Sequence, residues 1–385
     1  MRTTRGAFMV GPERLEVREV ELSPLGPEDV LLRIAACGVC GSDLHQYHGR
    51  WPQPEVVAGH EIGAVVEETG TEVSELRPGD PVCVEPILRC GRCRYCLTGR
   101  YLLCERGGFI SVQAHGGFAE RIVVPAYCCF RLAADLDPEL GAFAEPLSVG
   151  LHAVRLAAPT GADTVLVLGA GAIGLMTVAA ARAMGAGRVF VTARYLHQAE
   201  AARALGADET LSADGATEAL REVCPDGPDV VVETVGTVGG VTGEALQLVR
   251  KLGTVVLVGG VTAPVPIDLG PIIYGELRVL GSPCYGQTGV RKDFEIAAEL
   301  LSTRVVDVAP LVTGRFPLDE IGRAFRAAAD KRRGAVKVLV TAGDRRGSCA
   351  SRVGRASRPA KPPIMRRRPA RRPAYATCQT TSGDR

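Results

Sequence analysis

The chain has 385 residues, of which 46% are hydrophobic and 23% charged, so it can bury a core and is not disordered throughout. Its net charge of +2 hides a division, because residues 345–385 hold 12 Lys and Arg with one Asp (+11) and residues 1–344 carry −9. The total charge therefore indicates no class of partner. With no apolar signal segment at the N-terminus, the 13 cysteines do not fit a small secreted disulfide framework, and we expect a cytoplasmic protein whose clustered cysteines bind metal.

The first 145 residues contain short β-rich runs separated by turns, which favours an antiparallel, barrel-like domain. Strands are expected at 29–34, 61–68 and 80–84. From Pro146 onward, apolar strands alternate with Ala-rich helices, which predicts a doubly wound parallel sheet of the α/β class. Its expected strands are 165–168, 188–192, 229–233 and 254–258, and its expected helices are 173–184, 198–205 and 243–251. Helices at 294–301 and 324–329 and a strand at 336–340 close the folded part.

Two further segments need an interpretation. Residues 164–181 are uncharged and long enough for a membrane span, but their glycine pattern has a better explanation below, so we expect no membrane segment. Residues 345–385 are rich in Arg, Pro, Ser and Ala without apolar periodicity, which predicts a disordered tail. An arm that binds nucleic acid or an acidic membrane is the alternative for this tail, and a solvated extension or an abnormal reading of the chain's end is favoured over it.

The strongest chemical signal is a cysteine series with the spacing C-x2-C-x2-C-x7-C, formed by Cys90, Cys93, Cys96 and Cys104. Four thiolates in one short loop can close a tetrahedral zinc site and leave no position for water, which is the character of a structural site. An iron–sulfur cluster uses a similar spacing, and four separate buried cysteines are the third interpretation. We favour zinc.

A second set of metal-binding side chains is spread along the chain: Cys40, His60, Glu61 and Glu145. Mixed Cys, His and carboxylate ligands with one open position are typical of a catalytic zinc. Asp43 could orient His60 or another ligand by a hydrogen bond without binding the metal itself. Each residue alone is a weak signal, and a single histidine such as His60 is more often structural.

The third signal is a glycine fingerprint, G-x-G-x-x-G, that follows an apolar strand and opens a helix. This context predicts dinucleotide binding, since the glycines permit a tight turn and the helix N-terminus attracts the pyrophosphate. The candidate contacts are Gly169, Gly171, Ile173 and Gly174, with Val258 and Gly259 at the end of a later strand.

Coenzyme choice depends on the end of the next strand, where an NAD site places an acidic residue. Ala193 stands there and Arg194 follows it. Without the carboxylate, a 2′-phosphate is not repelled, and a guanidinium can bind it. The sequence therefore predicts NADP, with NAD as the alternative.

Together, the motifs GVCGSDLH, GHE, the four-cysteine loop, GGFAE, EPLSVGLHA and GAGAIG resemble the zinc-dependent medium-chain dehydrogenase/reductase family over residues 7–343. Glu145 before Pro-Leu-Ser is similar to the polyol and threonine dehydrogenase branch. The resemblance implies a GroES-like catalytic domain (1–146 and 287–344), a Rossmann coenzyme domain (147–286) and an active site between them. The tail, 345–385, departs from the family pattern.

The resemblance also implies residue roles. Cys40 and His60 would bind the catalytic zinc with Glu61 or Glu145, Ser42 would accept the alcohol proton, and His45 would pass it to solvent. It implies two zinc ions per chain and a dimer or tetramer. The aromatic residues Tyr47, Trp51 and Tyr285 are candidates for the pocket wall or for plain core.

We therefore expect a zinc- and NAD(P)-dependent oxidoreductase acting on a secondary alcohol or ketone, with a polyol, a cyclitol or an amino alcohol as the small-molecule substrate. An NADPH-dependent biosynthetic aldehyde or ketone reductase is the alternative within this class. A zinc-bearing nucleic-acid-binding protein is the alternative from another class, but the acidic body and the dinucleotide fingerprint argue against it. A non-catalytic relative is disfavoured because Cys40, Ser42, His45, His60 and Glu145 are all present.

Overall fold

The computed structural model describes residues 2–236 and 240–343, and the chain up to Gly343 forms one compact unit. The predicted tail at 345–385 lies outside the described residues. Among the helices that are described, none is both long and apolar enough to cross a membrane.

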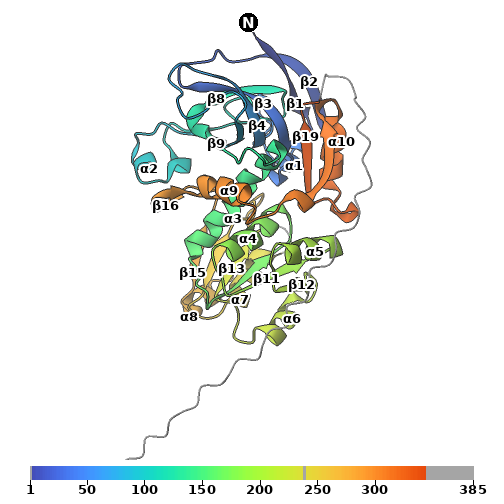
Figure 1. The fold of residues 1–385 in the computed structure, drawn as a ribbon. Coiled ribbons are helices and arrows are strands. Elements are labelled where there is room, and N and C mark those ends of the chain that lie inside the picture. Colours follow the sequence, from blue (N-terminus) through green and yellow to red (C-terminus); the bar gives the residue numbers. More distant parts are fainter. Residues whose placement is uncertain (1, 237–239, 344–385) are drawn as a thin grey trace, which may run out of the picture. The chain divides into compact units, whose positions relative to one another are not determined.

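A seven-stranded sheet is built from both ends of the chain, and red β19 lies among the blue N-terminal strands (Figure 1). Its order is β18-β19-β3-β4-β5-β9, with β8 also pairing with β3. The C-terminal β19 runs antiparallel to β3, with Leu339 opposite Gly38. The strands are β3 (Asp29–Gly38), β4 (Glu61–Thr69), β5 (Pro81–Val84), β8 (Arg121–Pro125), β9 (Cys129–Arg131), β18 (Val312–Pro317) and β19 (Lys337–Thr341).

Smaller elements surround this sheet. The helices are α1 (Gly41–Tyr47), α2 (Arg94–Leu97), α9 (Asp293–Ser302) and α10 (Ile321–Ala329). The short strand pairs are β1 (Thr3–Gly11) with β2 (Arg14–Glu21), β6 (Ile87–Leu88) with β7 (Gly108–Phe109), and β16 (Gln287–Thr288) with β17 (Arg291–Lys292). The 3₁₀ turns η1 (Tyr101–Leu103) and η3 (Pro138–Phe143) lie in the connections.

The middle of the chain forms a six-stranded parallel sheet with the order β12-β11-β10-β13-β14-β15. Written from its first strand, this order is 3-2-1-4-5-6, the doubly wound arrangement that binds dinucleotides where the order reverses. The strands are β10 (Thr164–Leu168), β11 (Arg188–Ala193), β12 (Glu209–Ser212), β13 (Val230–Glu233), β14 (Thr254–Leu257) and β15 (Arg278–Gly281). The helices are α3 (Ala144–Ala157), α4 (Ala172–Ala183), α5 (Leu196–Ala204), α6 (Ala216–Val223), α7 (Val241–Leu248) and α8 (Gly270–Gly275).

Both faces of this sheet are buried, which explains its continuous apolar strands. Along β10, Val165 and Val167 join the core that contains α3, α4 and α9, whereas Leu166 and Leu168 join the core on the opposite face. The α/β class and the doubly wound sheet are therefore confirmed. The two sheets divide the chain near the expected places, but the domain boundaries at 146, 287 and 344 stay a prediction.

Most predicted elements end within a few residues of the observed ones. The clearest difference is the helix expected at 243–251, because α7 covers Val241–Leu248 and Val249 already has an extended backbone. The side chain of Val249 is buried in the same core as Leu166 and Leu168. Leu252, whose backbone φ is +63°, then turns the chain into β14. Tertiary packing thus ends the helix before its sequence pattern does.

A buried ion pair joins the two ends of the chain at the centre of the first sheet. The Nζ atom of Lys337, at the start of β19, lies 2.7 and 2.6 Å from the two carboxylate oxygens of Glu61, at the start of β4. Both side chains are 1% exposed. A charge buried this deeply needs its partner, because water cannot replace it.

We predict that Lys337→Met lowers the free energy of unfolding by about 3–5 kcal/mol, because it leaves the Glu61 carboxylate buried without a counter-charge. The double variant Glu61→Gln, Lys337→Met should recover part of that loss. Chemical denaturation of the parent protein and these two variants measures both losses. As a control, Arg323→Met breaks an exposed pair with Glu320 and should cost less than about 1 kcal/mol. Equal losses for the single and double variants would contradict the prediction.

Candidate active site

The predicted catalytic residues come from three elements. Cys40 precedes α1, which carries Ser42 and His45, while His60 directly precedes β4 and Glu145 lies in the first turn of α3. The start of α1 is fixed by Asp43, whose carboxylate accepts a hydrogen bond of 2.9 Å from the Cys40 backbone N–H. This cap turns the chain directly after β3 and places Cys40 at the helix start.

His60 is the centre of the group. Its Nδ1 lies 3.6 Å from the Asp43 carboxylate, and its Nε2 lies 3.4 Å from the Ser42 hydroxyl oxygen. Burial alone would lower the pKa of His60, but the negative charges of Asp43, Cys40 and Glu145 outweigh it and raise the pKa well above its usual value. Asp43, which is 1% exposed, therefore orients the histidine from behind, as the sequence suggested.

The two candidate carboxylates differ in their surroundings. Both oxygens of Glu61 bind Lys337, as described above. Glu145 is also buried, and burial raises its pKa to about 7 although the nearby charge of His60 opposes this. Of the two, Glu145 is the carboxylate that Lys337 does not hydrogen-bond. Its charge also acts electrostatically on His60.

His45 lies on the coenzyme side of α1. Its ring packs at 4.9 Å from the Trp51 ring, and its Nε2 lies 4.0 Å from where a Cβ on Gly260 would be. Gly260 belongs to the loop after β14, so His45 faces the doubly wound sheet. Burial lowers the pKa of His45, which keeps its ring neutral near neutral pH and able to accept a proton. Tyr47, by contrast, is buried against Phe325 and belongs to the core.

The glycine fingerprint has the geometry that its function needs. Gly169 follows β10 with a φ of +95°, and a Cβ on Gly174 would lie 1.7 Å from the Gly169 carbonyl oxygen. Around Gly171, in contrast, a Cβ would meet nothing within 4 Å. The first glycine therefore makes the turn, the third allows the close packing of α4, and the second leaves open space above the helix N-terminus. Ile173 lies in the first turn of that helix.

The neighbouring strand ends support this loop. The Thr192 hydroxyl in β11 accepts a hydrogen bond of 2.8 Å from the Gly169 N–H. Ala193 ends β11, and the exposed Arg194 follows it. On the other side, the N–H groups of Val258 and Gly259 donate to the Glu233 carbonyl at 2.9 and 3.1 Å. All the predicted coenzyme contacts thus lie at the carboxyl ends of parallel strands.

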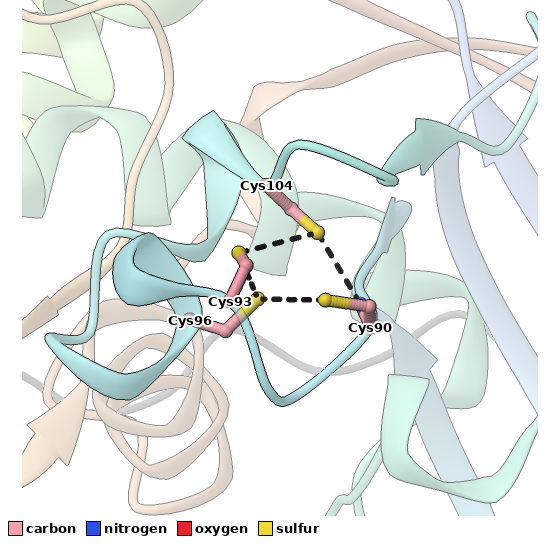
Figure 2. A group of neighbouring side chains, drawn as sticks. All are labelled: Cys90, Cys93, Cys96 and Cys104. Atoms are coloured by element: carbon pink, nitrogen blue, oxygen red, sulfur yellow. Dashed lines mark hydrogen bonds between the residues drawn. The ribbon is translucent and has the colours of Figure 1, made fainter.

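The four cysteines converge on one point (Figure 2). Sulfur–sulfur distances are 3.5 Å for Cys93–Cys96, 3.9 Å for Cys93–Cys104 and 4.0 Å for Cys90–Cys96. A tetrahedral zinc ion with bonds of about 2.3 Å would separate its sulfur ligands by roughly 3.8 Å. Backbone N–H groups, first that of Cys96, lower the pKa of Cys93 to about 6 and so favour its thiolate. The arrangement fits a single small cation that prefers sulfur.

Among the described residues, this is the group of His, Cys, Asp and Glu side chains whose ligand atoms all lie within 4.8 Å of one another. Cys40 and Glu145 both act on His60, but the ligand atoms of these three residues do not all lie within 4.8 Å of one another. The sequence missed Lys337, Thr192 and Glu233. Thr192 and Glu233 could have been found from their places at strand ends, whereas Lys337 lies 276 residues from Glu61 and gives no sequence signal.

Comparisons with known proteins agree with this geometry. Residues 26–134 match the family described as alcohol dehydrogenase GroES-like domain, and residues 172–303 match the family described as zinc-binding dehydrogenase. The chain is 34% identical to L-idonate 5-dehydrogenase from Vitis vinifera and 35% identical to sorbitol dehydrogenase from Arabidopsis thaliana. These alignments cover 86% of the chain in both cases, and 93% and 94% of the relatives.

Among solved structures, a Sinorhizobium meliloti protein described as a zinc-binding dehydrogenase and bound to NADP superposes with a TM-score of 0.80. It is 34% identical, and the alignment covers 89% of this chain and all of the other. The fold, the fingerprint and the order of the motifs all agree with these relatives. The chain therefore belongs to the zinc-dependent medium-chain dehydrogenase/reductase family and is an NAD(P)-dependent alcohol dehydrogenase of its polyol and threonine dehydrogenase branch.

Proposed function

We propose that this enzyme oxidises a secondary alcohol of the polyol, cyclitol or amino-alcohol class with NADP, or reduces the corresponding ketone. The observation that carries this proposal is the position of His60, which has Asp43 behind it, Ser42 at its other nitrogen and Cys40 and Glu145 close by. Thiolate, imidazole and carboxylate together suit a catalytic zinc that keeps an open position for the substrate.

In this proposal Cys40, His60 and Glu145 would hold the catalytic zinc, and Glu61 would join them only after leaving Lys337. When bound, zinc polarises the substrate oxygen and NADP exchanges the hydride. Ser42 takes the proton from the substrate hydroxyl, since its oxygen lies beside His60. His45, whose pKa is lowered by burial and whose ring lies next to the coenzyme loop, would receive this proton and release it to solvent.

We further propose that the four-cysteine loop holds a second, structural zinc. The short sulfur–sulfur distances support a single ion, because an iron–sulfur cluster would place several atoms between the cysteine sulfurs and hold them farther apart. The neighbouring backbone N–H groups support bound thiolates.

A homodimer is the proposed assembly. β15 ends the parallel sheet, so one of its edges has no partner strand among the described residues. Ile273 and Tyr274 in the adjoining α8 are 64% and 84% exposed. An open strand edge beside exposed apolar side chains favours pairing with a second copy about a two-fold axis.

The proposed reaction is tested with sorbitol, galactitol, myo-inositol and L-threonine as substrates, each with NADP⁺ and NAD⁺, while the absorbance of the reduced nicotinamide is recorded. We expect turnover of at least one of these alcohols above that of ethanol. The corresponding ketones with NADPH test the reductase alternative. Absence of turnover in both directions would contradict the proposal.

The metal assignment predicts two zinc ions per chain by elemental analysis. Cys93→Ser should reduce the content to one and lower the melting temperature. Cys40→Ser should abolish turnover while the circular dichroism spectrum stays unchanged, because that thiolate binds metal at the catalytic site. Cys224→Ser, which lies away from both groups, is the control and should change neither metal content nor turnover. Full turnover in Cys40→Ser would disprove the catalytic assignment.

The coenzyme proposal predicts that Ala193→Asp shifts kcat/KM toward NAD, because the new carboxylate repels the 2′-phosphate and can bind a ribose hydroxyl. Arg194→Ala should lower kcat/KM for NADP about tenfold or more, the effect of one charged hydrogen bond, and leave the value for NAD unchanged. Steady-state kinetics with both coenzymes measures the ratio. An unchanged ratio in both variants would exclude a role for this strand end in coenzyme choice.

A further inference from the structure

A hollow of about 630 Å³ lies between the doubly wound part of the chain and the segment that ends α10. Tyr195, two residues after the end of β11, lines one side of it, and residues of α10 and of the following 3₁₀ turn η6 (Lys331–Arg333) line the other. In Figure 1 the orange segment after α10 comes down to α5, which begins directly after Tyr195. The hollow therefore lies at the strand end that the coenzyme proposal concerns.

Three cations line this hollow without an acidic partner. They are Arg326 in α10, and Lys331 and Arg332 in η6. Among the residues that the structure describes, none forms an ion pair with any of the three. Like charges that share one hollow repel one another and make its electrostatic potential positive, so the hollow favours an anion.

The two acidic residues of the hollow have partners of their own. The Glu13 carboxylate lies 3.0 Å from His48 Nδ1, and the Asp330 carboxylate lies 3.2 Å from Arg333 Nε. Neither acid therefore balances the three cations, and the hollow keeps a surplus of positive charge.

Lys331 is the most sheltered of the three cations, because it is half-buried whereas Arg326 and Arg332 are exposed. Burial and the like charge of Lys337 lower the pKa of Lys331 to about 8, although the charges of Cys40 and Glu61 oppose this. An anion bound beside Lys331 would stabilise its charged form. Lys331 is therefore the cation of this hollow that gains most from an anionic ligand.

The position of the hollow indicates which anion it would take. In a doubly wound sheet, the adenosine ribose lies at the end of the second strand, where the 2′-phosphate distinguishes NADP from NAD. The backbone after this strand is already occupied, because the N–H groups of Arg194 and Tyr195 donate to the Gln198 side-chain oxygen at 3.3 and 3.4 Å. Side chains must therefore supply the groups that bind a phosphate here.

We propose that Lys331 and Arg332 bind the 2′-phosphate of NADP across the hollow from Tyr195, and so add to the recognition that Arg194 supplies. The inference rests on the proposed preference for NADP, and it names residues that lie far along the chain from the glycine fingerprint. The phosphate would thus bridge the coenzyme sheet and the segment that leads into β19.

The test is calorimetric binding of 2′,5′-ADP and of 5′-AMP to the full-length enzyme, because these two ligands differ only in the 2′-phosphate. We expect the parent enzyme to bind 2′,5′-ADP more tightly. Lys331→Met keeps the aliphatic side chain and removes the charge, so it should weaken the binding of 2′,5′-ADP about tenfold, as expected for one hydrogen bond to a charged group, and leave that of 5′-AMP unchanged. Arg323→Met removes the same charge from a residue of α10 that lines a different hollow and pairs with Glu320, and it should change neither affinity.

A second variant, Arg332→Ala, reaches the same hollow through an exposed side chain, so the inference remains testable if Lys331→Met does not fold. It should weaken the binding of 2′,5′-ADP about threefold, as expected for an exposed ion pair. An unchanged affinity for 2′,5′-ADP in the folded variants, or an equal loss for 5′-AMP, would overturn the inference and leave the preference for NADP intact. If the parent enzyme binds the two ligands equally, the preference for NADP itself fails, and the inference fails with it.

Discussion

The hydrogen bonding of β19 to β3 is the constraint on which the catalytic site depends. It brings Lys337, the first residue of β19, to Glu61, whose carboxylate it neutralises directly beside His60. Without this pairing, two glutamates and an aspartate would crowd around one histidine, and like charges in a buried space repel strongly. The pairing of the two ends of the chain in one sheet thus also supplies the positive charge that the buried Glu61 needs.

The second sheet supplies a different kind of order. Its strands are parallel and buried on both faces, so their carboxyl ends meet along one edge and their loops share a common space. Gly169 makes the turn, Thr192 fixes it, and the loop after β14 closes it near His45. The backbone of these loops therefore places His45 against the coenzyme loop without the help of a ligand.

The sequence was informative where function imposes local spacing. The cysteine series and the glycine fingerprint each fall within a few residues, so the local chain alone determines their geometry, and the structure brings both sets together. Alternation of strands and helices likewise predicted the parallel sheet. The helix α3 was not predicted as an element because Pro146 read as a boundary, although proline is well tolerated in a first helical turn.

Long-range partners could not be predicted in this way. Glu61 looked like a metal ligand next to His60, and only the folded sheet reveals the lysine that holds it. The contacts of Asp293 are similar, because its partners include His152, which lies 141 residues away along the chain. Such contacts depend on tertiary packing, for which a single sequence carries no periodic signal.

The shared sheet also has a consequence for the order in which the molecule is made. All six strands of the parallel sheet lie between Thr164 and Gly281, so that sheet can be complete while the chain is still growing. The first sheet must wait for β18 and β19, which are synthesised last among the described strands. Its early strands therefore remain with an open edge until more than 300 residues have emerged, and such an edge is prone to wrong pairing. During synthesis, the half of the protein that begins first is the half that finishes last.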